Sequence, residues 1–243
     1  MAEITRLFSS SRLDPGEVMR LSEEEVHHVH KVLRGRPGVR VEVVDGAGRL
    51  FVAELLGGSE ATILEERPTT GGDEGEVVLY QAVPKRRHMD LVVEKATELG
   101  VSRIVPLYTE RSVVRLSEGD GKVRRWRRVA EAAARQSLRL RIPEVSEIVS
   151  FSEGAQEAGE TGVLLHNEAE LPPLEDVVPG PVVGLFVGPE GGFGDGELAT
   201  AREAGLSLAS LGPYRLRTET AGMVAVARAR ALVERTMSAG TSL

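Results

Sequence analysis

The sequence predicts an α/β fold with a mostly parallel sheet, preceded by a small domain of antiparallel strands. From Val77 onward, strand-like and helix-like segments alternate, which is typical of a parallel sheet covered by helices. Before that point, short apolar runs are joined by turns rich in glycine. The segment 67–75 between the two patterns has the composition of a linker. We therefore expect one domain over 1–70 and a second over 71–243.

The first domain is predicted to be a compact β-barrel. Strands are expected at 39–44 and 50–56, on either side of Asp45-Gly46-Ala47-Gly48. Aspartate and glycine tolerate positive φ, so this tetrapeptide is a good hairpin turn. A further short strand is expected at 61–64. A small set of antiparallel strands of this kind suggests a barrel.

The second domain is predicted to alternate between strands and helices. The expected strands are 77–83, 102–108, 161–166, 182–187 and 207–211, and the expected helices are 87–99, 120–139, 195–204 and 218–235. In the last helix, ten of the thirteen residues 221–233 are apolar or alanine. A helix that is apolar nearly all round is buried on more than one side, which is compatible with a second subunit. The small, polar tail after Arg235 is expected to fray.

Composition favours a soluble, cytoplasmic protein. The chain has no cysteine, which excludes disulfides and thiolate metal sites. No apolar run approaches the roughly 20 residues that span a bilayer, and the N-terminus lacks the pattern of a signal peptide. No metal site is predicted either, because few of the side chains in His27-His28-x-His30 can point the same way.

Charge is distributed unevenly along the chain. The net charge is −7, yet residues 85–141 contain 15 Lys and Arg against 7 Asp and Glu. Residues 142–210 contain 1 basic side chain against 13 acidic ones. A basic segment inside an acidic chain predicts a local surface for phosphate groups. The alternative is that the two blocks neutralise each other across the fold.

Two short segments near the C-terminus are the strongest candidates for a functional site. Gly188-Pro189-Glu190-Gly191-Gly192-Phe193 follows an expected strand and precedes an expected helix, and Leu216-Arg217-Thr218-Glu219-Thr220-Ala221 follows about twenty-five residues later. Glycines in such a turn let the backbone approach a flat ligand. The first segment is neither the Gly-x-Gly-x-x-Gly fingerprint nor a phosphate-binding loop with lysine, and no nucleophile elbow is present. The residues alone therefore predict a ligand site without naming the ligand.

The two segments resemble the paired signatures of the RsmE-type methyltransferases of the SPOUT (trefoil-knot) superfamily. In the same order along the chain, Lys85, 94–101, Pro106 and 110–112 also match family positions. At the N-terminus, 6–8, His27-His28-x-x-x-Val32-Leu33-Arg34 and 45–48 resemble the family's small PUA-like RNA-binding barrel. The resemblance covers nearly the whole chain.

The resemblance implies methylation of ring nitrogen 3 of a specific uridine in 16S ribosomal RNA, with S-adenosylmethionine as the cofactor. It implies a trefoil-knot domain, a homodimer, and 16S ribosomal RNA or the small ribosomal subunit as partner. The cofactor is expected to lie bent in a cleft between three loops. The residues expected to bind it are Leu165, His166, Gly188, Pro189, Glu190, Gly191, Leu211, Gly212, Leu216, Thr218 and Thr220.

Arg217 and Glu219 are the candidates for the reacting centre. Arg217 would stabilise the negative charge that develops on uracil, and Glu219 would orient a loop or accept the proton. The alternative is structural, because an ion pair of Arg217 with a carboxylate such as Glu190 would join the two loops.

RNA contacts are expected from basic side chains in both domains. The expected RNA-binding residues are His28, Lys31, Arg34, Arg36, Lys85, Arg86, Lys95, Arg111, Arg125 and Arg128. For His27 and His28, local packing of the barrel is the alternative to RNA contact. Three positions depart from the family pattern: Tyr214 replaces an arginine, Leu138 a glycine, and Gly194 a serine that would cap the next helix, a role left to Asp195.

Two other functions fit the same residues. One is a SPOUT methyltransferase that modifies another RNA position, such as a ribose hydroxyl. The other is a non-catalytic RNA-binding or ribosome-assembly protein that kept the fold.

Overall fold

The computed structural model describes residues 6–23, 25–27, 29, 36–69, 75–85, 88–112, 121–168 and 170–240. The chain divides into two compact units. The first unit comprises Met1–Gly72 together with Ala134–Arg141, and the second comprises Asp73–Ala133 and Ile142–Leu243. In the described parts of the chain, no helix combines the length and the apolar character that crossing a membrane requires.

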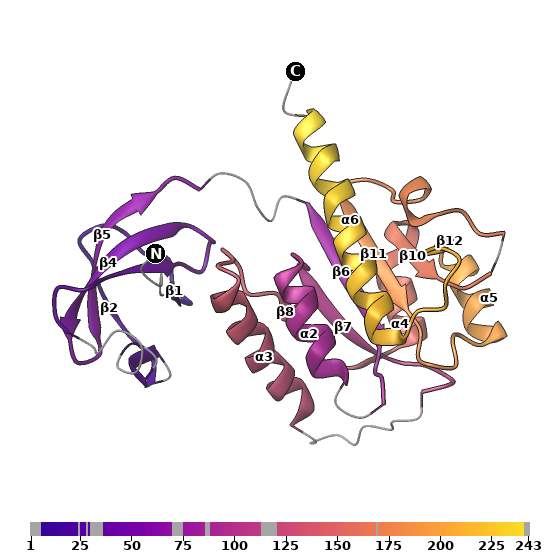
Figure 1. Ribbon diagram of the computed structural model, residues 1–243, viewed down its shortest axis with the longest axis horizontal. Helices are drawn as coiled ribbons and strands as arrows, with labels where there is room; N and C mark the ends of the chain where they lie inside the picture. Colours follow the sequence, from indigo (N-terminus) through magenta and orange to yellow (C-terminus); the bar gives the residue numbers. More distant parts are fainter. Residues whose placement is uncertain are drawn as a thin grey trace. The chain divides into compact units, whose positions relative to one another are not determined.

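The first unit is a curled sheet of five strands (Figure 1). Its order is β1-β3-β4-β5-β2, and all neighbours are antiparallel except the parallel pair β1 and β3. The hairpin of β3 and β4 is confirmed: the Asp45 carboxylate accepts hydrogen bonds from the N–H groups of Ala47 and Arg49, both at 2.9 Å. Strands β1 and β2 were missed, because three residues are too few to show an alternating pattern. The strand bounds are Arg6–Phe8 (β1), Val18–Arg20 (β2), Arg40–Val44 (β3), Leu50–Gly57 (β4) and Glu60–Arg67 (β5).

The second unit contains a seven-stranded sheet in which every pair is parallel. The order is β12-β10-β11-β6-β7-β8, with β9 also paired to β7. All five predicted strands are confirmed, whereas β8 and β9, of two residues each, were missed. The bounds are Glu76–Ala82 (β6), Arg103–Tyr108 (β7), Glu144–Val145 (β8), Val149–Ser150 (β9), Gly162–Leu165 (β10), Val182–Val187 (β11) and Ser207–Ala209 (β12).

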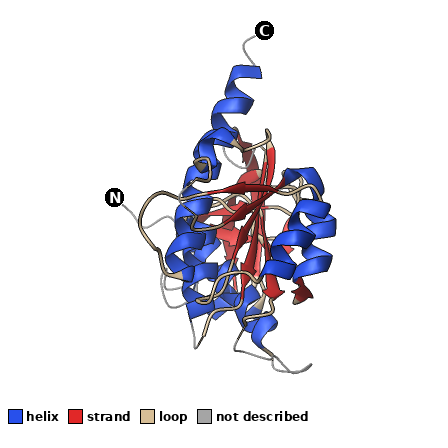
Figure 2. Cartoon of the chain, turned by 90° about the vertical axis from the view of Figure 1, so that its right-hand side faces the viewer, coloured by secondary structure: helices blue, strands red, loops and turns tan. Residues whose placement is uncertain are grey.

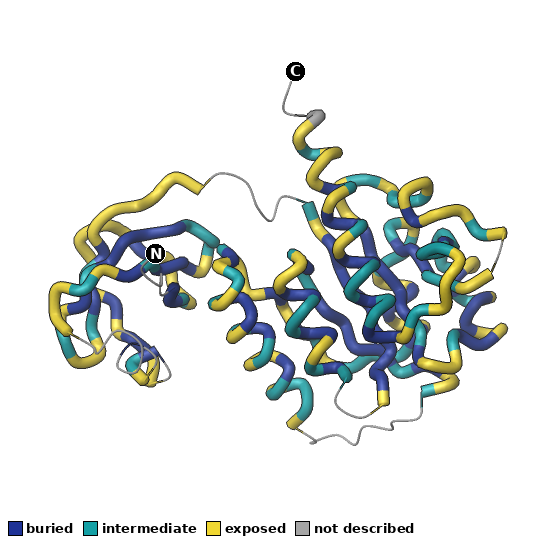
Figure 3. The backbone as a smooth tube through the Cα atoms, in the orientation of Figure 1, coloured by how far each residue is buried: buried dark blue, intermediate teal, exposed yellow. Residues whose placement is uncertain are grey.

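Helices cover both faces of this sheet (Figure 2). Alternate residues of β6 enter two different cores: Val77 and Leu79 pack with α2, α3 and α6, whereas Val78 and Tyr80 pack with α4 and α5. The strands are therefore buried along most of their length (Figure 3), as expected of a parallel sheet. The helix bounds are His88–Glu98 (α2), Lys122–Gln136 (α3), Phe151–Ala158 (α4), Asp195–Glu203 (α5) and Thr218–Gly240 (α6), with 3-10 turns at Gly159–Thr161 (η1) and Leu174–Asp176 (η2).

Two predicted helix ends are wrong. The helix expected over 120–139 ends at Gln136, because Leu138 adopts φ 57° and two hydrogen bonds close the end: Arg139 N–H to Ala134 O and Leu138 N–H to Arg135 O. This is the Schellman arrangement, in which glycine normally occupies the position of Leu138. The last helix does not end at Arg235 as expected, since α6 continues to Gly240.

Helix α4 was not predicted, although a local sequence signal marks its start. Ser150 accepts a hydrogen bond from the Glu153 N–H, and the Glu153 carboxylate accepts one from the Ser150 N–H. Serine followed three residues later by glutamate is a capping box. The helix was still not predicted, because its eight residues are too few to show a clear helical periodicity.

The strand order reverses between β6 and β11. From β6 the chain adds β7 on one side, and it later returns to place β11 on the other side. In open parallel sheets, ligands bind outside the carboxyl ends of the strands at such a reversal. Because β6, β10, β11 and β12 are adjacent and parallel, the loops that follow them meet at one edge.

Candidate functional site

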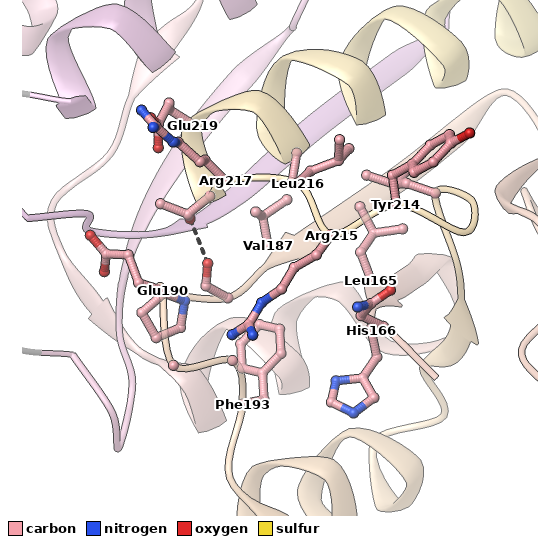
Figure 4. A pocket seen from close by; sticks show the side chains of 18 of the residues that line it. Leu165, His166, Val187, Glu190, Phe193, Tyr214, Arg215, Leu216, Arg217 and Glu219 are labelled. Carbon is pink, nitrogen blue, oxygen red and sulfur yellow. Dashed lines mark hydrogen bonds between the residues drawn. The ribbon is translucent and has the colours of Figure 1, made fainter. Parts of the chain in front are cut away.

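A cavity of about 710 Å³ opens at the edge of the sheet where these loops meet. This volume lies in the range of roughly 300–1,000 Å³ that is usual for small-molecule sites. Its walls include the segments after β10, β11 and β12 (Figure 4). His88, at the start of α2, also lines it. The lining residues are His88, Leu165, His166, Asn167, Val187–Phe193, Leu211, Gly212, Tyr214–Glu219 and Ala221.

One wall is the glycine turn after β11. The Pro189 carbonyl accepts a hydrogen bond from the Gly192 N–H at 2.9 Å, and Gly192 has φ 70°, a conformation that favours glycine. A Cβ on Gly188 would lie 3.2 Å from the Phe193 ring, which is buried in the core below. The glycines thus allow a tight turn whose backbone lines the cavity.

Thr218 joins this turn to the wall on its other side. The Thr218 hydroxyl donates to the Gly188 carbonyl at 2.5 Å, the bond drawn as a dashed line in Figure 4. It accepts from Gln81 Nε2 at 3.0 Å, and Gln81 is fully buried in β6. Thr218 is itself buried as the first residue of α6. One side chain therefore fixes both signature segments to the central sheet at the strand reversal.

Arg228 of α6 fixes a third part of the cavity. Its Nη1 donates to the Leu211 carbonyl at 2.8 Å, and its Nε donates to Glu175 Oε1 at 2.6 Å, with a second bond from Nη2 to Glu175 Oε2. The hydrogen bonds from Arg228 hold the pKa of the Glu175 carboxyl below its ordinary value. Gly212, which follows Leu211 in the chain, has φ 122°. The Leu211 wall is thus shaped by a bidentate ion pair outside the cavity.

The two candidates for the reacting centre lie on the cavity with different environments. Arg217 is exposed, whereas Glu219 is only 8% exposed. Glu219 Oε1 lies 3.4 Å from His88 Nδ1. The suggested pair of Arg217 with Glu190 does not form, because Glu190 Oε1 instead accepts from the Lys85 N–H at 3.1 Å. Glu190 therefore anchors the glycine turn to the end of the β6 segment.

Ten of the eleven residues expected to bind the cofactor line this cavity, and Thr220 does not. Figure 4 shows Leu165 and His166 on the opposite side from Glu190. Eight lining residues are not among those individually expected to bind the cofactor or to react. Most of these lie in or beside the predicted signature segments and loops, but His88 lies far away in the sequence and no motif marks it. The eight are His88, Asn167, Val187, Gly192, Phe193, Tyr214, Arg215 and Ala221.

The residues expected to bind RNA have diverse environments. Lys95 pairs with Glu94 and Glu98, whose hydrogen bonds raise its pKa. Arg125 pairs with Asp90 at 2.5 Å. The Arg111 side chain donates to the Gly191 carbonyl at 2.9 Å and so supports the glycine turn. Arg36, Lys85, Arg111 and Arg128 are exposed, and four of the set lie outside the described residues: His28, Lys31, Arg34 and Arg86.

Helix α5, which follows the glycine turn, is capped differently from the expectation. Gly194 is the N-cap, and its N–H donates to Glu197 Oε2 at 2.9 Å. The other carboxylate oxygen of Glu197 accepts from the Glu110 N–H at 2.8 Å. Asp195 does not replace the missing serine, because it is already the first helical residue. The cap comes from a residue inside the helix.

Comparison with known proteins identifies the family. A family model described as an RNA methyltransferase domain matches residues 73–230, and one described as an RNA methyltransferase PUA domain matches 21–65. The ribosomal RNA small subunit methyltransferase E of Mycobacterium bovis is 36% identical over 236 residues, which cover 91% of this chain and 89% of that protein. This chain belongs to that family. The protein of the same name from Synechocystis is 33% identical, over 88% of this chain and 73% of its own length.

Solved structures agree with this assignment. A methyltransferase E from Neisseria gonorrhoeae bound to S-adenosylmethionine has a TM-score of 0.86 at 30% identity, over 95% of this chain and 98% of that one. A putative methyltransferase from Legionella pneumophila, also with its bound cofactor, has a TM-score of 0.85 at 31% identity, over 94% and 98%. The chain is therefore a methyltransferase, and the cavity is its candidate site for S-adenosylmethionine.

Proposed function

We propose that this protein transfers a methyl group from S-adenosylmethionine to ring nitrogen 3 of a uridine in the 16S ribosomal RNA of the small ribosomal subunit. The observation that carries the proposal is the meeting of the two signature segments around one cavity, joined by the Thr218 hydroxyl. The names of the relatives support ribosomal RNA as the substrate. The uridine and its ring nitrogen are taken from the family resemblance.

The residues present fit this cofactor. The glycine turn leaves backbone groups accessible on one wall, and Leu165, Val187 and Leu211 offer apolar surface for a flat ring. S-adenosylmethionine supplies a methyl group on a positively charged sulfur. What the protein must add is alignment of the acceptor and help with loss of the imide proton.

Arg217 and Glu219 are proposed to serve the reacting centre. The exposed Arg217 guanidinium can approach a uracil carbonyl and stabilise the negative charge that develops as the proton leaves. Glu219 is buried at the start of α6 and is better placed to orient a neighbouring group.

We also propose the knot, the domain division, the cellular location and the oligomeric state of this protein. The loops after β10, β11 and β12 would form a trefoil knot around the cofactor. Residues 1–70 would be a PUA-like barrel that binds RNA, with the methyltransferase domain over 71–243. The protein would act in the cytoplasm as a homodimer, to which the largely apolar α6 could contribute.

The proposal is tested by nucleoside mass spectrometry of small-subunit RNA from a strain that lacks the gene. We expect 3-methyluridine to disappear from this RNA and to return when the wild-type gene is restored. Persistence of 3-methyluridine would refute the assignment, and loss of a ribose-methylated nucleoside would favour the rival methyltransferase. Calorimetric titration with S-adenosylmethionine tests the non-catalytic alternative, which predicts no binding at millimolar cofactor.

A further inference from the structure

The cavity contains a histidine that neither the motifs nor the family signatures mark. His88 is the first residue of α2, and its side chain is 43% exposed. The Glu219 side chain, from the first turn of α6, is only 10% exposed and lies with Oε1 3.4 Å from His88 Nδ1. Two helices far apart in sequence thus place a buried carboxylate behind an accessible imidazole.

This order of groups has a chemical consequence. A carboxylate beside Nδ1 favours the tautomer that carries its proton on Nδ1, which leaves Nε2 free to accept a proton. The exposed ring, and not the buried carboxylate, is then the group that a substrate can reach.

We propose that His88 accepts the N3 proton of the target uridine, and that Glu219 positions the His88 ring. The inference rests on the proposed function. In this step the N3–H bond breaks, its proton moves to His88 Nε2, and its electron pair remains on N3. N3 forms the new bond to the methyl carbon, and the electrons of the broken carbon–sulfur bond remain on sulfur. The proton later leaves His88 to water.

Two other carboxylates, Asp90 in α2 and Glu190 on the cavity wall, have other partners in the described part of the chain. Asp90, two residues after His88 in α2, pairs with Arg125 at 2.5 Å. Glu190 accepts from the Lys85 main chain. Arg217, from the segment before α6, is exposed. Glu219 is therefore the carboxylate that the fold assigns to His88.

Single-turnover kinetics test the catalytic role. We expect H88Q to lower the methyl-transfer rate by about 10²-fold or more, as is typical for loss of a general base, and to remove the rise of rate with pH on the acid side. E219Q should lower the rate less, and the double variant H88Q/E219Q should be no slower than H88Q. All rates are measured at saturating S-adenosylmethionine, because His88 lines the cavity and its replacement can also weaken cofactor binding. A wild-type rate and pH profile in H88Q would overturn the proposal.

Nitrogen NMR of the protein without cofactor provides a readout independent of activity. The neutral His88 ring should carry its proton on Nδ1 in the wild type and on Nε2 in E219A. A wild-type ring protonated on Nε2 would also overturn the proposal. The two hypotheses fail separately: a wild-type enzyme that makes no 3-methyluridine contradicts the proposed function, whereas an active wild type matched by H88Q contradicts only the role of His88.

Discussion

Thr218→Val removes the hydroxyl that joins both signature segments to the sheet while keeping the side-chain shape. The Gly188 carbonyl loses its 2.5 Å donor, whereas Gln81 Nε2 keeps its second bond to the Ala82 carbonyl at 3.1 Å. The half-buried Gly188 carbonyl thus loses its donor, and one N–H of the fully buried Gln81 side chain loses its acceptor. Together these losses cost about 2 kcal/mol, within the usual range of about 1–3 kcal/mol for an unsatisfied group. For a chain of this size, that cost lowers the midpoint of thermal unfolding by about 4–8 °C.

The same change should weaken the cofactor site, because Gly188 and Thr218 both line the cavity. We expect the affinity for S-adenosylmethionine to fall by about tenfold, equivalent to about 1.4 kcal/mol. Thr218→Ser is the matched control, since it keeps the hydroxyl and removes only a methyl group. Thermal unfolding and calorimetric titration of the three proteins measure both effects. If T218V melts and binds like wild type, the hydroxyl does not hold the site together.

Three further predictions concern other parts of the structure. Leu138→Gly should be about 1 kcal/mol more stable toward urea than Leu138→Ala, because only glycine relieves the positive φ at the end of α3; equal stabilities would show that no strain is present. Asp45→Asn should destabilise the first unit by about 2 kcal/mol near pH 7. Burial raises the pKa of the Asp45 carboxyl, but the hydrogen bonds from Arg49, Ala47 and Leu13 outweigh this and hold the pKa below its ordinary value of 3.8. The stabilisation is therefore present above that value and is lost as the pH falls through the lowered pKa; in urea unfolding, the free energies of the two proteins should differ at pH 7 and approach each other only below pH 3.8. Arg228→Ala should lower the affinity for S-adenosylmethionine by about tenfold by freeing the Leu211 carbonyl, with Arg202→Ala, on the exposed side of α5, as the control; equal calorimetric affinities would contradict the role of Arg228.

The sequence was informative wherever local pattern and tertiary structure agree. Long apolar strands such as 182–187 are buried on both faces, so their hydrophobic runs identify them directly. The glycine turn was recognisable because its glycines allow the tight backbone conformation that joins β11 to α5. The short strands β1, β2, β8 and β9 have no such pattern, because tertiary pairing alone creates them.

Contacts between segments that are distant in the sequence could not be predicted from local sequence patterns. The Glu219–His88 approach depends on how α2 and α6 pack, and the bond from Thr218 to Gln81 depends on strand order. Leu138 was unpredictable for a related reason. The residue in left-handed conformation at a helix end is normally glycine, and here it is leucine. The Schellman hydrogen bonds maintain that conformation without the usual signal.

The most direct test of the account is methyl transfer by the purified protein to small-subunit RNA from the deletion strain, followed by nucleoside mass spectrometry. With S-adenosylmethionine present, we predict that one new methylated nucleoside, 3-methyluridine, appears. Transfer to a ribose, or no transfer to either free RNA or assembled subunits, would contradict the account.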